Sequence, residues 1–100
     1  MNVMSTCYRR NDDVLSRHIA DEALLVPLRG RLADMQSLFA LDPVAEFIWQ
    51  RLDGKQSLAD ISAAIVESFE VQADEAEVDL REFVAALVQA GLAAEAKRDG

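Results

Sequence analysis

The chain has 100 residues, of which 51% are hydrophobic and 28% are charged, the balance of an ordinary soluble globular domain. This length accommodates one domain with a single hydrophobic core. The formal net charge of −8 is uneven, because residues 55–100 carry ten acidic and four basic side chains. An acidic C-terminal half repels phosphate backbones and favours basic partners or basic peptide segments.

Disulfide, metal and membrane chemistry are not expected. Cys7 is the single cysteine and His18 the single histidine, so the sequence has no internal disulfide and no recognisable zinc or iron–sulfur site. The apolar runs are too short to cross a bilayer, and the N-terminus lacks the basic region and apolar run of a secretory signal. We therefore expect a cytoplasmic protein with no cofactor and no membrane contact.

The two ends of the chain carry no periodic pattern. We expect residues 1–13 to form a mobile lead-in, within which Cys7 is incidental to function, and residues 93–100 to form a C-terminal tail. The domain itself is then expected over residues 14–92. Residues 92–97 fit either a short terminal strand or a frayed end, and the sequence leaves both open.

Three short strand patterns follow the lead-in. Residues 16–21 and 23–28 predict a hairpin joined at Asp21-Glu22, because apolar residues in the second segment alternate at the period of a half-buried strand. Pro27 cannot donate to a strand ladder, so regular pairing should end near it. Residues 37–41 predict a third strand.

The next stretch contains a complete helix signal. Asp42 can cap the first turn with its carboxylate, and Pro43 occupies the first helical position, where the missing N–H costs nothing. Gly54 supplies the left-handed residue that commonly closes a helix. We predict a helix over residues 43–52.

Two further helices are predicted, over residues 58–69 and 75–90. Ser57 and Asp60 form a capping-box pattern at the start of the first, and Asp74 is expected to cap the second. Apolar residues repeat at helical spacing in all three helices. The expected core is Ile48, Trp49, Ile61, Ile65, Leu80, Val84 and Leu87.

One flank of the last predicted helix differs from the other. The apolar stripe of this helix ends at Gly91, and beside it lie Asp79, Phe83, Ala86 and Ala90. Small side chains beside one aromatic ring would let another segment approach the helix closely.

Three short strands followed by three helices predict an α+β fold with a three-stranded antiparallel sheet, in the order of a winged-helix-like module. Short motifs in matching order and spacing over residues 11–92 resemble the PqqD-like family: Leu41-Asp42, Ile48-Trp49, Leu52-Asp53-Gly54, Leu58-Ala59-Asp60-Ile61, Phe69-Glu70-Val71, Asp79-Leu80, Phe83-Val84, Leu87 and Gly91-Leu92. Upstream pieces also fit: Arg17, Ala23-Leu24-Leu25-Val26-Pro27-Leu28 and Gly30. Many members of that family carry Asn at the position of Asp42, and both residues cap helices.

The resemblance implies a RiPP recognition element, a domain that binds the leader of a ribosomally made precursor peptide. Such domains present the leader to a modifying enzyme, often a radical-SAM protein. The leader typically adds as an antiparallel strand to the third strand and lies against the third helix. Carried onto this sequence, the peptide-binding residues are Ser37, Leu38, Phe39, Ala40, Leu41, Asp79, Phe83, Ala86 and Ala90. A free strand edge at residues 37–41 independently favours strand addition.

The sequence also bears on other classes of function. No catalytic constellation is recognisable, so an enzyme is not expected. A winged-helix DNA-binding regulator is the main alternative, yet its reading helix would carry five acids from Asp74 to Glu82 and a single base, Arg81. We therefore expect no nucleic-acid partner. A structural partner subunit of an enzyme stays open, as does the choice between PQQ synthesis and another modified-peptide pathway.

Overall fold

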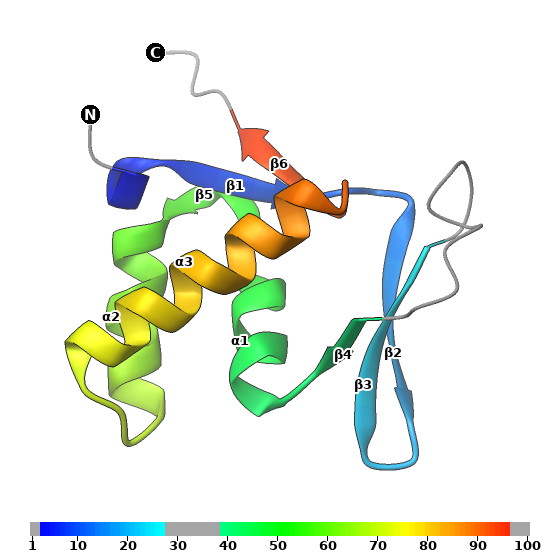
Figure 1. Ribbon diagram of the computed structural model, residues 1–100, viewed down its shortest axis with the longest axis horizontal. Coiled ribbons are helices and arrows are strands. Elements are labelled where there is room, and N and C mark those ends of the chain that lie inside the picture. Colours follow the sequence, from blue (N-terminus) through cyan, green and yellow to red (C-terminus); the bar gives the residue numbers. More distant parts are fainter. Residues whose placement is uncertain (1–2, 28–38, 97–100) are drawn as a thin grey trace.

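The computed structural model describes residues 3–27 and 39–96, and all structural statements below concern those residues. A short 3₁₀ turn, η1 (Val3–Ser5), precedes the strands and helices (Figure 1). In chain order these are β1 (Cys7–Arg10), β2 (Val14–Ile19), β3 (Glu22–Pro27), β4 (Phe39–Leu41), α1 (Pro43–Arg51), β5 (Asp53–Ser57), α2 (Leu58–Ser68), α3 (Ala73–Gln89) and β6 (Ala93–Ala96).

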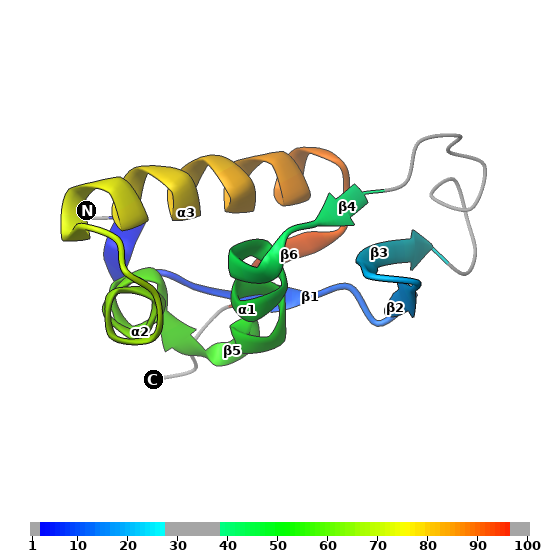
Figure 2. The same cartoon turned by 90° about the horizontal axis from the view of Figure 1, so that it is seen from below.

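The strands form two antiparallel sheets. The hairpin sheet has the order β2-β3-β4, and the terminal sheet has the order β5-β1-β6. Figure 1 shows β2 and β3 projecting away from the helices, and Figure 2 shows α3 lying across one side of the molecule with α1 and α2 beneath it. The hairpin sheet followed by three helices confirms the predicted α+β class.

The terminal sheet was not predicted. Residues 7–10, expected in an unstructured lead-in, form its central strand, and the Cys7 side chain is buried. The Arg10 guanidinium donates to the carbonyls of Trp49 and Gln50 at 3.0 and 2.8 Å, which fastens β1 to the end of α1. Of the two alternatives left open for residues 92–97, the strand is the one observed, because β6 pairs with β1. The expectations of a loose lead-in and tail are therefore wrong for these residues.

The hairpin turns one residue earlier than predicted. Its loop is Ala20-Asp21, because Ile19 pairs with Glu22, and Ala20 takes a positive φ of 58°. Two-residue hairpin loops require such left-handed residues. The observed register buries Ala23 and Leu25 against the core.

The predicted start of α1 is confirmed, but the role of Gly54 is not. The Asp42 carboxylate accepts from the Ala45 N–H at 2.7 Å, and Pro43 stands at the first helical position. The helix ends at Arg51, whereas Gly54 lies within β5 with φ +80°. A Cβ at Gly54 would lie 3.3 Å from that of Ala96, so glycine permits the close approach of strands in the terminal sheet.

The predictions for the other helix ends are likewise confirmed only in part. At α2, Ser57 and Asp60 make the predicted capping box in both directions. The predicted cap at Asp74 is wrong, since α3 begins at Ala73 after Gln72, without a side-chain cap. The C-terminal end of α3 follows the prediction.

Gly91, with φ +79°, closes α3. The Gly91 N–H donates to the Val88 carbonyl, and the Leu92 N–H donates to the Leu87 carbonyl at 2.8 Å, the pattern of a Schellman motif. The motif turns the chain so that Leu92 is buried and β6 reaches β1.

The predicted core is confirmed. Its seven residues are all buried in one cluster: Ile48, Trp49, Ile61, Ile65, Leu80, Val84 and Leu87. Strand residues belong to the same cluster: Val14, Ala23, Leu25, Leu41 and Ala93. The core therefore joins the helices to both sheets and holds α3 by its central stripe.

Candidate functional site

The strand β4 has one open edge. It pairs with β3 through Ala23–Leu41, Leu24–Ala40 and Leu25–Phe39, and no strand of the described residues pairs with its other side. An edge strand presents unpaired N–H and C=O groups that another chain can use as a template. The predicted residues Phe39, Ala40 and Leu41 thus form an edge strand, whereas Ser37 and Leu38 lie outside the described residues.

A cavity opens where β4 ends and α1 begins. It has a volume of about 340 Å³ and lies between α1 and α3, which Figure 2 shows one above the other. We call it the α1–α3 cavity. Its lining residues are Asp42, Val44, Ala45, Ile48, Ile65, Val71, Ala76, Asp79 and Phe83. Because Asp42 directly follows Leu41, the end of β4 adjoins the cavity.

The cavity has an apolar floor and an acidic rim. Ile48, Ile65 and Ala76 are buried at its base, whereas Asp42 and Asp79 are exposed. The Asp42 carboxylate is partly engaged in capping α1, and Asp79 makes no ion pair within the described part of the chain. Such a site can take an apolar side chain and attract a neighbouring basic group.

The structure divides the helix residues predicted for the site. Asp79 and Phe83 line the cavity together. Ala86 and Ala90 do not line it; they continue the same flank of α3 at helical spacing, Ala86 exposed and Ala90 half-buried against the core. The flank therefore borders the cavity at Asp79 and Phe83 and continues outside it at Ala86 and Ala90.

Several cavity residues were not predicted as site residues. Val44, Ala45 and Val71 are half-buried at its wall. Val44 lies on the apolar face of α1, and apolar periodicity alone does not separate a core wall from a cavity wall.

A short polar link ties the hairpin sheet to the cavity wall. The His18 Nε2 on β2 lies 2.6 Å from the Glu46 Oε2 on α1. Away from the site, backbone N–H groups of Lys55 and Gln56 donate to Asp53, and the bond from Lys55 is the main cause that lowers the pKa of Asp53 below its usual value. This carboxylate bonds within β5, where the pairing with β1 is irregular, and it does not line the cavity.

Neither a metal centre nor a membrane span is found in the described ranges. Within residues 3–27 and 39–96, no three His, Cys, Asp or Glu side chains gather as metal ligands do. No helix in these ranges combines the length and the apolar character needed to cross a bilayer. The chemical features of the α1–α3 cavity are its apolar floor and the carboxylates of Asp42 and Asp79.

The chain matches the family model of coenzyme PQQ synthesis protein D (PqqD) over residues 22–93. It therefore belongs to this family, which confirms the resemblance drawn from its motifs. No curated protein matches the chain.

Two solved structures are similar to it. One is TbiB1 in complex with the TbiA(beta) leader peptide, 33% identical, covering 85% of this chain and 93% of that chain with a TM-score of 0.67. The other is lasso peptide synthetase B1 complexed with the leader peptide, 24% identical, covering 87% of this chain and 96% of that chain with a TM-score of 0.70. The second likeness shows the shared fold.

Proposed function

We propose that this chain is a RiPP recognition element that binds the leader of a ribosomally made precursor peptide. The observation that carries the proposal is the open edge of β4 beside the α1–α3 cavity. The similarity to TbiB1, whose structure contains a leader peptide, supports it.

The leader in this proposal pairs antiparallel with Phe39–Leu41 and lies along α3. Backbone hydrogen bonds supply affinity and fix the register, while alternate side chains of the added strand point to one face. One apolar leader side chain fills the α1–α3 cavity beside Phe83, and a basic leader residue lies near Asp79. The small side chains of Ala86 and Ala90 leave room for the strand to pass.

The chain supplies binding rather than chemistry in this proposal. It holds the leader while a modifying enzyme acts on the rest of the precursor. The partner of such domains is often a radical-SAM protein. Because ribosomally made precursors begin in the cytoplasm, we place this role there. A DNA-binding role is not favoured, since Asp74, Glu75, Asp79 and Glu82 are exposed on α3 and repel phosphates.

A titration tests the proposal. A candidate leader is taken from any short precursor gene found beside the gene for this chain. It is labelled with a fluorophore, and its anisotropy is followed as protein is added. We expect Ala86→Trp to weaken binding at least tenfold, which corresponds to about 1.4 kcal/mol, because the indole blocks the path of the added strand.

The matched control is Ala63→Trp, which places the same bulky group on an exposed alanine of α2 away from the cavity. It should leave the leader affinity unchanged, and circular dichroism should show both variants folded. Equal leader affinity in wild type and a folded Ala86→Trp protein would contradict the proposed site. No binding of the leader to wild type would contradict the function itself.

A further inference from the structure

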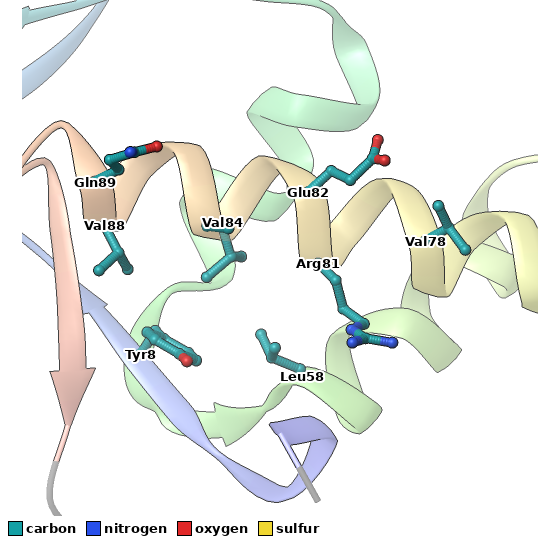
Figure 3. Close-up of a pocket in the computed structure, with 9 residues that line it drawn as sticks. Tyr8, Leu58, Val78, Arg81, Glu82, Val84, Val88 and Gln89 are labelled. Carbon is teal, nitrogen blue, oxygen red and sulfur yellow. The ribbon is translucent and has the colours of Figure 1, made fainter.

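A second groove runs along the opposite flank of α3. It has a volume of about 790 Å³, and Figure 3 shows Tyr8 and Leu58 on one side facing Val84 and Val88 on the other. We call it the Tyr8 groove. None of its lining residues lines the α1–α3 cavity.

The Tyr8 groove is apolar along about three helical turns. Val84 and Leu58 are buried in its floor, while Val78 and Val88 are 51% and 41% exposed at its two ends. The two valines are ten positions apart, a distance of about 15 Å along a helix axis. Large aliphatic groups left exposed around a concave surface mark an interaction site.

The backbone around this groove is already used. Tyr8 belongs to β1, the central strand of the terminal sheet, which pairs with β5 on one side and β6 on the other. The α3 backbone is bonded within its own helix. A partner lying between β1 and α3 therefore cannot pair with β1 and must dock through side chains, as an amphipathic helix does in a groove.

The unpaired charge at the rim is negative. Glu82 lines the groove, and Glu95 stands directly opposite Tyr8 in the β1–β6 register, hence on the same face of the sheet. Within the described residues neither glutamate forms an ion pair. The positive charge of Arg81 is paired, because its Nη1 lies 3.9 Å from the Oε1 of Glu77. Basic side chains on a partner would complement this rim.

We propose that the Tyr8 groove docks an amphipathic helix of the peptide-modifying enzyme, with aliphatic residues one turn apart and Lys or Arg along the edges. The choice of partner rests on the proposed function, since a domain that presents a peptide must hold the enzyme by another surface. Leader and enzyme lie on opposite flanks of α3, so both can bind at once.

Two synthetic helical peptides test this inference. Each has about 15 residues with Leu at every third or fourth position; one carries Lys beside the Leu stripe and the other carries Glu. We expect the Lys peptide to bind and to shift the amide signals of residues around Val84 and Val88, and the Glu peptide to bind at least tenfold more weakly.

Matched variants locate the binding. Val88→Lys places a charge in the groove, and Val66→Lys places it at a 37% exposed valine of α2 outside the groove. We expect a tenfold or greater loss of Lys-peptide affinity for Val88→Lys alone, with leader affinity retained in both variants. If the wild-type protein does not bind the leader, the proposed function is contradicted. The affinity for the Lys peptide still tests the groove in that case.

Three outcomes would overturn the assignment. The first is no binding of the Lys peptide at millimolar concentration, and the second is equal loss in Val66→Lys and Val88→Lys. The third is self-association of the chain alone, measured by sedimentation and abolished by Val88→Lys, because a second copy would then occupy the groove.

Discussion

The two flanks of α3 offer different chemistry to a binding partner. The α1–α3 cavity, of about 340 Å³, adjoins the open backbone edge of β4. The Tyr8 groove, of about 790 Å³, adjoins a strand whose two edges are both paired. A partner on the first flank can be held in register by backbone hydrogen bonds, whereas a partner on the second must fit by side-chain shape and charge.

One helix can serve both flanks because its central stripe is anchored. Leu80, Val84 and Leu87 are buried, and residues three and four positions apart align on each side of that stripe. The anchoring explains why a single exposed substitution should affect one flank and leave the other intact. Substitutions on either flank test this independence, whereas a substitution in the buried stripe should affect both flanks.

The largest effect is expected from the shared anchor. Replacing Leu87, which is 0% exposed, with Ala should lower the free energy of unfolding by about 2–5 kcal/mol through cavity formation, and binding on both flanks should weaken together. Urea denaturation followed by Trp49 fluorescence measures the loss. Val88→Ala, at the neighbouring exposed position, is the control and should cost less than 1 kcal/mol. A loss below 1 kcal/mol for Leu87→Ala would contradict the assigned stripe.

The backbone contribution of β4 can be separated by a pair of proline variants. Neighbouring N–H groups in a strand point in opposite directions, so Phe39→Pro and Ala40→Pro remove donors on opposite edges. One variant should mainly lose stability, and the other should lose leader affinity by about 0.5–1.5 kcal/mol, the value of one hydrogen bond. Calorimetric titration with the leader and with the Lys peptide measures both flanks. Unchanged leader affinity in both folded variants would argue against strand addition.

The smallest expected effects come from single rim charges. Asp79→Lys and Glu82→Lys make the same charge change on the two flanks of α3. Exposed charges contribute about 0.2–1 kcal/mol, so we expect Asp79→Lys to slow leader association a few-fold and Glu82→Lys to slow Lys-peptide association a few-fold. Stopped-flow rates at low and high salt measure this. Each variant is the control for the other, and identical effects of the two on the leader would contradict separate flanks.

Local signals in the sequence determined the helices. Each end signal acts within a few residues of the helix end that it stabilises, as do Asp42 with Pro43, the Ser57–Asp60 box and Gly91. Their effect can therefore be predicted without knowledge of the tertiary structure. The buried stripes were readable for the same reason, because helical periodicity is a property of the segment itself. Asp79 and Phe83 line the cavity. As peptide contacts these two residues stay predictions, as do Ala86, Ala90 and the residues along β4.

Tertiary structure decided the terminal sheet and the two concave surfaces. Cys7 pairs with Ser57 and with Ala96, and these contacts between distant residues gain free energy only when the chain has collapsed. Gly54 shows the same limit: its left-handed conformation was readable, but its place between strands was not. Whether an apolar residue such as Val44 fills a core or lines a cavity depends on what packs opposite it, and that partner comes from another part of the chain.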